Sequence, residues 1–411
     1  MNTKIDVAII GAGPYGLSLA AHLNAAGVEH RVFGAPMEAW RSHMPPGMHL
    51  KSTGESSNLF DPHSVFTLED FSREKGLDYH SSRLPVKLET FIAYGRAFQQ
   101  RFAPRVEPKQ LVALSAADRG YALGFDSGET VTAKRVVLAI GVVPFKHTPS
   151  ALAHLPAALV SHSSDWGPLD RLEGKEVTVL GGGSSALDIA ALLTMRGAAV
   201  TIVSRSPRVI FYSPPGPDPS LLRRLISPSS GLGGGWPLRI CADAPQLIHL
   251  LPDRMRHAIL TKTLGPAGGY FIRDQVERNA TLKLARTIAQ AEEHGGRMRL
   301  TTVGADGARE TIESDHIVAA TGYRVDLRRL GFLDDSALQR IRTVDHSPIL
   351  NANFESSAPG LYFVGLASAR SFGPVMRFVV GADRPARRLG RLLPKSLLRR
   401  PISISAAIPE N

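Results

Sequence analysis

The chain alternates short apolar segments with longer stretches of mixed polarity, which is the pattern of an α/β protein. Buried strands are predicted at residues 6–10, 30–33, 136–140, 177–180, 199–203, 317–320 and 361–364. Helical patterns follow at 17–26 and 187–196, each directly after a strand and a glycine-rich turn. The repeated order of strand, turn and helix predicts an α/β fold that contains two units of the same kind.

The two glycine-rich turns carry the most information. The first contains Gly11, Gly13 and Gly16 around Pro14 and Tyr15, and the second contains Gly181, Gly183 and Ala186 around Ser184 and Ser185. The first glycine permits a tight bend, the second lets the backbone approach a pyrophosphate, and the third position must be small for helix to pack on strand. The helix N-terminus then offers unpaired N–H groups to the phosphates. Two such turns in the same context predict two Rossmann-like dinucleotide-binding domains.

Glycines at other strand ends indicate that the first of these domains is split. The strands at 136–140 and 317–320 end near Gly141 and Gly322, at positions typical of crossings between domains. Gly365 follows the last strand, where backbone N–H groups can approach an anionic cofactor, although a plain strand-ending turn explains it too. We therefore predict a first domain at 1–150 and 319–411, with a basic C-terminal tail. The second domain, at 151–318, is inserted into the first.

An irregular insertion is expected within the second domain, at about 207–280. It is rich in Gly and Pro, which break regular structure, and long irregular segments often form lids or binding loops. The segment is interpreted either as the substrate side of the site or as a surface excursion with a small helical core at 244–264.

The residues after each turn differ in a way that bears on the nucleotide. Gly34 ends the second strand, where an acidic residue usually holds an adenosine ribose. Glu38 lies a few residues on and is explained equally as a ribose ligand or as a helix-start carboxylate. After the second turn the strand ends in Ser204 and Arg205, and an arginine there suits the extra phosphate of NADPH. The alternative for Arg205 is a surface arginine without a ligand.

Composition narrows the function class further. The 411 residues carry a formal net charge of +11, but no aromatic-interleaved basic stripe accompanies it, so we expect a solvated basic surface and no nucleic-acid partner. Gly, Pro or charged residues interrupt every apolar run well before about 20 residues, which predicts no membrane span. The lone Cys241 excludes an internal disulfide and a CxxC redox pair. A cytoplasmic enzyme without a metal site is the expectation.

These features resemble the two-dinucleotide-domain flavoproteins, and within them the class B flavin monooxygenases, which include flavin-containing monooxygenases and the N-hydroxylases of lysine and ornithine. The two glycine turns, residues 320–323 and residues 360–365 carry the resemblance, which spans nearly the whole chain. It implies that the first domain binds FAD and the second NADPH. The predicted cofactor-binding residues are Gly11, Gly13, Pro14, Tyr15, Gly16, Glu38, Trp40, Gly141, Gly181, Gly183, Ser184, Ser185, Ser204, Arg205, Thr321, Gly322, Tyr323 and Gly365.

A more specific sequence motif of that family is FxGxxxH followed by xxxW, and this chain matches only its second half. His162 and Trp166 supply its second half, whereas Pro156 and Ala158 occupy the Phe and Gly positions. The motif lies at the hinge between domains, so its partial loss bears on oxygenation more than on flavin binding. Packing of a linker is the other explanation for His162 and Trp166.

One candidate catalytic residue follows from the resemblance. Asn58 stands where flavin-containing monooxygenases place an asparagine beside the flavin, and its amide would donate a hydrogen bond to a flavin hydroperoxide. Asn58 also begins the sequence Asn-Leu-Phe-Asp-Pro. A turn, in which Asn and Pro are favoured for their backbone conformations, explains the presence of Asn58 equally well.

The predicted function is an FAD- and NADPH-dependent monooxygenase that adds one oxygen atom of O2, through a flavin hydroperoxide, to a small nitrogen- or sulfur-containing metabolite. The alternative is an NADPH-dependent flavin oxidoreductase or oxidase without substrate oxygenation, and a non-catalytic nucleotide sensor is a third hypothesis. A carrier protein that delivers the substrate and a homodimer are both compatible with the sequence.

Overall fold

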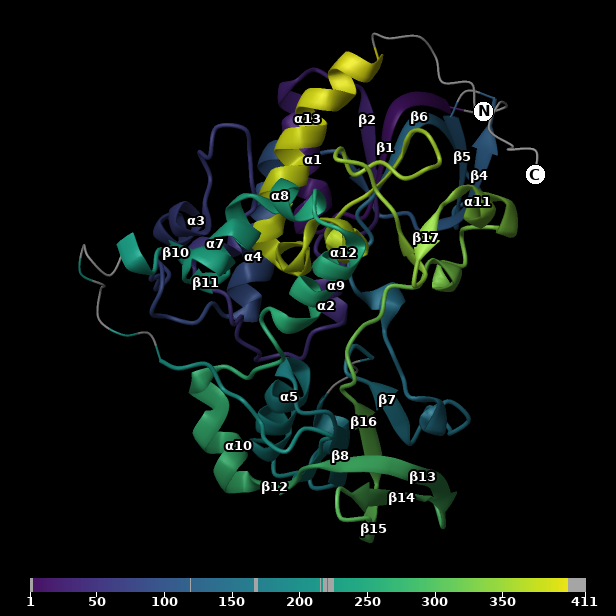
Figure 1. The fold of residues 1–411 in the computed structure, drawn as a ribbon. Helices are drawn as coiled ribbons and strands as arrows, with labels where there is room; N and C mark the ends of the chain where they lie inside the picture. The colour runs from purple at the N-terminus through teal and green to yellow at the C-terminus, as the bar shows by residue number, and fades with distance from the viewer. Residues whose placement is uncertain are drawn as a thin grey trace.

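Two sheets organise the chain, and each lies in its own lobe (Figure 1). The computed structural model describes residues 3–118, 120–165, 169–214, 216, 220 and 225–397. The sheet of the first lobe has the order β3-β2-β1-β6-β5-β4, with β19 also paired to β6. Its strands are β1 (Thr3–Ile10), β2 (His30–Phe33), β3 (Val106–Glu107), β4 (Leu111–Ala117), β5 (Gly120–Phe125), β6 (Thr130–Leu138) and β19 (Leu361–Phe363). The pairs β1–β2, β1–β6, β2–β3 and β6–β19 are parallel, whereas β5 pairs antiparallel with β4 and β6.

The sheet of the second lobe is parallel throughout and has the order β12-β9-β8-β16-β7. Its strands are β7 (Val160–His162), β8 (Glu176–Leu180), β9 (Ala199–Val203), β12 (Ala280–Lys283) and β16 (His316–Ala319). The chain leaves the first lobe after β6, builds the second sheet, and returns to the first lobe after β16. The predicted α/β fold, with one Rossmann-like lobe inserted into the other, is therefore confirmed, while the domain boundaries given above remain a prediction.

The helices cover the two sheets. Those of the first lobe are α1 (Pro14–Ala25), α2 (Glu38–Ser42), α3 (Leu68–Lys75), α4 (Leu88–Phe102), α11 (Asp335–Arg340), α12 (Ala369–Phe372) and α13 (Asp383–Leu397). Those of the inserted part are α5 (Ser184–Thr194), α7 (Trp236–Asp243), α8 (Pro245–His249), α9 (Asp253–Lys262) and α10 (Arg273–Asn279). Two short hairpins, β10–β11 (Ser229–Ser230, Gly233–Gly234) and β17–β18 (Thr343–Val344, Ser347–Pro348), lie outside the two main sheets.

The helices α7 to α9 pack on the first lobe, although they lie within the range 151–318 expected for the inserted domain. Cys241 and Ile248 belong to the same buried cluster as Ile9 of β1 and Phe372 of α12. Figure 1 shows α8 and α9 beside α12, with α7 next to α8. The insertion thus connects the second glycine turn with the C-terminal part of the first lobe.

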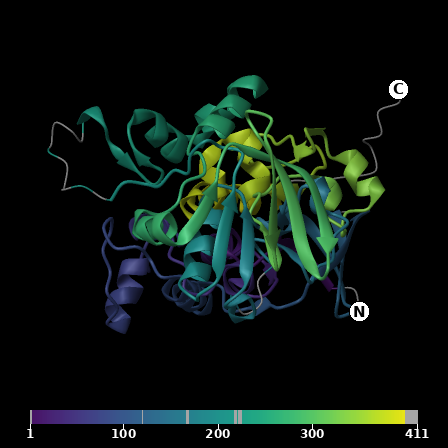
Figure 2. The ribbon, with the colours of Figure 1, turned by 90° about the horizontal axis from the view of Figure 1, so that it is seen from below.

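Both faces of the second sheet are covered. On one face α5 buries Ala186, Leu187 and other apolar residues against β8 and β9. On the other face lies an antiparallel sheet of β13 (Arg286–His294), β14 (Arg297–Gly304) and β15 (Arg309–Ser314), which buries Met298 and Leu300 against β16. Figure 2 views the molecule from the side of this lobe. No helix in the described part of the chain is long and apolar enough to cross a membrane.

The two segments that cross between the lobes pair with each other. The amide of His147 donates to the carbonyl of Gly322 at 2.9 Å, and the amide of Arg324 donates to the carbonyl of Phe145 at 2.8 Å. These bonds make a short antiparallel bridge between Lys146 and Tyr323. The two segments are therefore double-stranded at residues 145–147 and 322–324, and the domain boundaries near Gly141 and Gly322 remain a prediction.

A buried histidine in the second lobe makes folding stability depend on pH. His316 of β16 is 3% exposed and contacts the Ser161 hydroxyl and the Ala158 carbonyl. Burial lowers its pKa to about 4. The unfolded chain then binds a proton more readily than the folded chain, so stability is complete above about pH 6.5 and is lost as the pH falls toward 4.

We expect the free energy of unfolding of this lobe to fall by about 2–3 kcal/mol over that interval. Denaturant unfolding at a series of pH values should show a much shallower slope for His316→Asn than for the unchanged chain. Exposed His154→Asn serves as the control, and an equal slope in all three proteins would contradict the assignment.

Candidate functional site

The first glycine turn forms a cradle at the N-terminus of α1. Gly11 has φ +109°, and a Cβ at this position would lie 2.2 Å from the carbonyl oxygen of Ala139. A Cβ at Gly16 would lie 1.8 Å from the carbonyl oxygen of Gly11. A Cβ at Gly13, by contrast, would meet no protein atom within 4 Å, and no side chain caps the helix. Gly11 and Gly16 therefore hold the turn together, while Gly13 leaves open space beside free helix N–H groups.

The second turn repeats this arrangement at the N-terminus of α5. Gly181 has φ +131°, and a Cβ there would lie 2.4 Å from the carbonyl oxygen of Ala320. The amide of Gly181 donates to the carbonyl of Val203 at 2.9 Å, as that of Gly11 does to Phe33 at 2.7 Å. No side chain caps α5. Both turns thus present the same anion-binding geometry.

One cavity of about 1810 Å³ joins the two turns. The predicted residues that line it are Gly11, Gly13, Pro14, Tyr15, Glu38, Trp40, Gly141, Gly181, Gly183, Ser184, Ser185, Ser204, Arg205, Thr321, Gly322, Tyr323 and Gly365. Gly16 lies beneath the first turn and Asn58 lies elsewhere, so neither lines the cavity. Residues far apart in the sequence therefore meet around a single space that is large enough for two dinucleotides.

Asn58 is engaged by its own loop. Its amide nitrogen donates to the carbonyl of Glu55 at 3.0 Å, and its amide oxygen accepts from the amide of Leu68 at 2.8 Å. Both ends of the side chain therefore fix the turn that leads into α3. This is the backbone role that the sequence offered as an alternative, and a catalytic role for Asn58 remains a prediction.

The position of Glu38 bears on the adenosine end of the first cradle. Its carboxylate accepts from the Ser42 hydroxyl at 2.6 Å and lies 3.5 Å from Arg41, so its own helix α2 engages it. Gly34 has φ +118°, a backbone conformation that favours glycine over an acidic residue. Glu38 lines the cavity, and its role as a ribose ligand stays a prediction.

Ser184 has a protein partner in this structure. Its hydroxyl donates to the carbonyl of Ala267 at 2.9 Å, and a Cβ at Gly183 would lie 3.0 Å from Cβ of Pro266. The insertion therefore borders the second turn, and Leu264 to Ala267 line the cavity with it. The backbone N–H groups at the start of α5 remain the phosphate donors that the turn offers.

Positive charge gathers in the cavity near Arg205. Burial lowers the pKa of His147, and the charges of Arg324, Arg329 and Arg205 lower it further. All four residues line the cavity, and Arg205 itself is exposed. This cluster attracts anions to the end of the second cradle.

His162 is a neutral, fully bonded histidine at the crossing segments. Its Nδ1 accepts from the amide of Ser164 at 3.1 Å, so Nε2 carries the proton and donates to the carbonyl of Gly322 at 3.1 Å. Burial lowers its pKa, and its ring meets that of Tyr323 edge-on. These contacts fit the linker-packing interpretation; Trp166, the other residue of the motif, lies outside the described residues.

Sequence reasoning missed the C-terminal wall of the cavity, residues 376–379. The Tyr15 hydroxyl lies 3.1 Å from the carbonyl of Met376 and 2.9 Å from that of Phe378. Burial raises the pKa of Tyr15, so the hydroxyl stays protonated and donates. Tyr15 thereby ties the first turn to a segment more than 350 residues away, a contact for which the sequence holds no local signal.

We expect Tyr15→Phe to destabilise the first lobe by about 1–2 kcal/mol, because the carbonyls of Met376 and Phe378 lose the hydroxyl that bonds to them. Denaturant unfolding measures this effect directly. Tyr270→Phe is the matched control, since the Tyr270 hydroxyl donates to the carbonyl of Arg83 at an exposed position and should cost less than about 0.5 kcal/mol. Equal losses in the two variants would contradict the role given to Tyr15.

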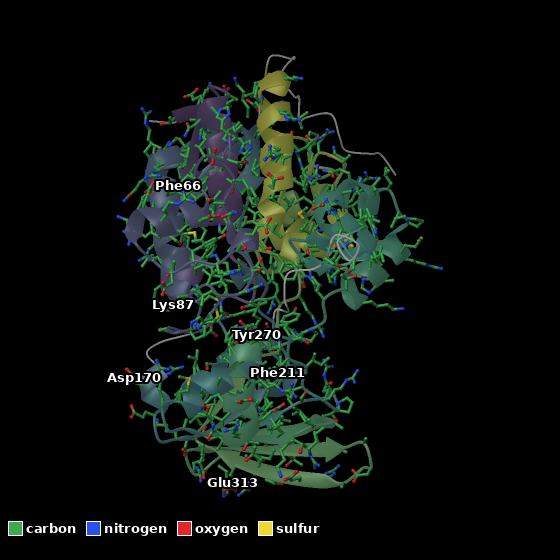
Figure 3. The ribbon with its side chains drawn as sticks, turned by 90° about the vertical axis from the view of Figure 1, so that its left-hand side faces the viewer. Phe66, Lys87, Asp170, Phe211, Tyr270 and Glu313 are labelled. Carbon is green, nitrogen blue, oxygen red and sulfur yellow. The ribbon has the colours of Figure 1, made fainter. Side chains whose placement is uncertain are left out.

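The lobes also contact each other next to the cavity. Nζ of Lys51 lies 2.5 Å from Oδ2 of Asp188 in α5, and the two side chains are 18% and 5% exposed. Burial raises the pKa of Asp188, and the Lys51 ammonium opposes that shift. Figure 3 shows Phe211 and Tyr270 where the lower lobe meets the upper one, with Lys87 on the upper side. These contacts fix the second turn relative to the first.

Comparisons with known proteins agree with this architecture. A family model described as pyridine nucleotide-disulphide oxidoreductase matches residues 5–217. An ornithine N-hydroxylase from Kutzneria sp. 744 superimposes with a TM-score of 0.76 at 17% identity, over 96% of this chain and all of the other. At this identity the likeness shows a shared two-lobe α/β fold.

Curated relatives are similar at low identity. An uncharacterised oxidoreductase CzcO from Bacillus velezensis is 24% identical over 92% of this chain and 96% of its own length. A ferredoxin–NADP reductase from Acidiphilium cryptum is 32% identical over 26% of this chain and 32% of its own length. Two further relatives are matched over 30% and 55% of their own length, so the chain spans about a third to a half of these two and of the Acidiphilium reductase.

Proposed function

We propose that this chain, which belongs to the pyridine nucleotide-disulphide oxidoreductase family, is an FAD- and NADPH-dependent monooxygenase acting on nitrogen or sulfur of a small metabolite. The observation that carries the proposal is the single cavity onto which both glycine turns open. Two dinucleotides bound by the two turns would meet inside it. The known N-hydroxylase with the same fold supports the choice of oxygenation.

The first turn has the shape that FAD requires. The open space at Gly13 admits a pyrophosphate, and the uncapped N-terminus of α1 supplies N–H donors to it. Gly365, with φ +71°, lies against the Tyr15 ring and brings its backbone to the cavity. These residues would hold the pyrophosphate and the adjoining chain of FAD.

The second turn and the basic cluster would hold NADPH. The N–H groups at the start of α5 face the cavity with Ser185, and Arg205 lies at the end of β9. A guanidinium suits the extra phosphate of NADPH because it donates two parallel hydrogen bonds to phosphate oxygens. Arg205 would therefore select NADPH over NADH.

Bound FAD would take two electrons from NADPH and pass them to O2, one atom of which ends in the product and the other in water. The protein supplies position and exclusion of solvent. Leu264, Met376 and Val379 provide an apolar wall, and the loop 264–267 borders the second turn from the insertion. Such a wall keeps water from the reacting groups.

A second candidate is an NADPH-dependent flavin oxidoreductase or oxidase that does not oxygenate a substrate. The engagement of the Asn58 amide by Glu55 and Leu68 favours it, because no described contact directs that amide into the cavity. Cys241 is free and buried, which argues against a dithiol mechanism in either candidate.

Product stoichiometry distinguishes the two candidates. The FAD-loaded protein is supplied with NADPH and air, together with a panel of amines, amino acids and sulfides. One oxygenated product per NADPH, with little hydrogen peroxide, supports the monooxygenase. Peroxide equal to the NADPH consumed, without product, supports the oxidase. A colourless protein that cannot be loaded with FAD rejects both.

Two finer points of the proposal concern partners. Delivery of the substrate by a carrier protein and assembly into a homodimer both remain predictions. Sedimentation of the FAD-loaded protein measures whether it forms a dimer. A comparison of free and carrier-linked substrates measures whether a carrier protein delivers the substrate.

A further inference from the structure

Arg377 occupies a place in the cavity that neither glycine turn explains. It ends the short 3₁₀ helix Pro374–Arg377 of the first lobe and lines the cavity together with Tyr212 and Leu264 of the insertion. One of its terminal nitrogens, Nη2, donates to the carbonyl of Thr263 at 2.7 Å and approaches that of Leu264 at 3.5 Å. The guanidinium therefore stands between the C-terminal wall and the insertion.

The charge of Arg377 has no counter-charge in the described part of the chain. Its Nε is buried and has no hydrogen-bond partner. Burial lowers the pKa of Arg377, the Tyr212 hydroxyl opposes that shift, and the guanidinium carbon lies 5.7 Å from the centre of the Phe378 ring. A desolvated cation without an anionic partner is unfavourable, so natural structures pair such groups.

Arg370 of the same lobe, by comparison, has carboxylates that neutralise its charge. Its guanidinium lies 2.7 Å from Asp253 and 3.2 Å from Asp345. Arg377 differs from it in facing a cavity, where a ligand can supply the missing anion. The nearby wall is apolar, with Ile210, Met376 and Val379, which strengthens an ionic contact made there.

We infer that Arg377 binds a carboxylate of the substrate, so that the substrate is a small amine or sulfide that also carries a carboxylate. The donor is the other terminal nitrogen, Nη1, because Nε is buried and Nη2 stays on the carbonyl of Thr263. A guanidinium N–H donates a charge-assisted hydrogen bond to a carboxylate oxygen. The inference deepens the proposed function and rests on it for the identity of the cavity as a substrate site.

Matched pairs of probes test this inference without requiring turnover. The FAD-loaded protein is titrated with L-ornithine and putrescine, L-lysine and cadaverine, and S-methylcysteine and its decarboxylated amine, and the change in flavin absorbance gives the dissociation constants. In the unchanged chain we expect at least one carboxylate to bind about tenfold more tightly than its partner. Arg377→Met should remove that preference, and Arg377→Lys should retain part of it.

Three outcomes would overturn the inference. These are no preference for any carboxylate in the unchanged chain, a preference that survives Arg377→Met, and an equal loss of NADPH affinity in that variant, which would assign Arg377 to the nucleotide. Arg286→Met, which removes another cavity arginine that donates to a main-chain carbonyl, should leave the preference intact. Carboxylate selectivity without oxygenated product would reject the proposed function and leave this inference standing.

Discussion

Gly13→Ala should yield a protein that folds normally and is nearly colourless. The added Cβ would meet no protein atom within 4 Å, and Gly13 has φ −88°, a conformation that alanine adopts without strain. The same methyl group would occupy the space through which a pyrophosphate approaches the N–H groups of α1. Hydrogen bonds from backbone N–H groups to the charged pyrophosphate contribute about 1.5–3 kcal/mol each. The loss of two of them predicts a decrease in FAD affinity on the order of 100-fold or more.

The matching change in the second turn is the control. Gly183→Ala should leave FAD binding unchanged and weaken NADPH instead, with some further cost because its Cβ would press on Pro266. Equilibrium dialysis against FAD and NADPH measures both affinities, and thermal unfolding of the FAD-free proteins verifies the fold. If Gly13→Ala retained FAD, or lost it only by unfolding, the first turn would not be the FAD cradle.

Features that depend on neighbouring residues were predictable from the sequence. The strands at His30–Phe33 and Ala199–Val203 have the predicted bounds, and both glycine turns open the helices expected after them. A strand, a tight turn and a helix start are encoded within about 20 residues, so composition and spacing suffice. All the predicted cofactor residues except Gly16 line one cavity.

Features that depend on distant contacts were not predictable. The bond from Tyr15 to Met376 and Phe378 joins the two ends of the first lobe, and no spacing encodes it. The packing of Cys241 and Ile248 on the first lobe follows from shape complementarity that a run of Gly and Pro residues does not reveal. Arg377 escaped notice for the same reason, because an arginine is informative only when its burial and its missing partner are known.

Asn58 illustrates the limit of inference from a motif. The residue matches the position of a functional asparagine in a family that the chain resembles, yet its amide contacts Glu55 and Leu68 and shapes a turn. Asn is favoured in turns because its short side chain bonds to nearby backbone. One residue type therefore serves two purposes, and only the contacts of its amide distinguish them.

Arg205→Ala should reverse or abolish the preference for NADPH over NADH. No described carboxylate pairs with the Arg205 guanidinium, which is exposed at the end of β9 and lines the cavity. Its charge is therefore available to a phosphate, and NADH lacks the phosphate that it would contact. Removal of a charge-assisted, two-point contact predicts an increase of about 10- to 100-fold in the KM for NADPH, with less than about a threefold change for NADH.

The measurement is the rate of flavin reduction at a series of NADPH and NADH concentrations, without oxygen. Arg278→Ala removes a positive charge from α10 of the same lobe, away from the cavity, and controls for the change in overall charge. Increasing the salt concentration should weaken NADPH binding to the unchanged chain more than to Arg205→Ala, because the lost contact is ionic. A parallel decrease for NADPH and NADH would mean that Arg205 positions the second turn, and the selectivity would then belong to Arg324 and Arg329, which gather around His147.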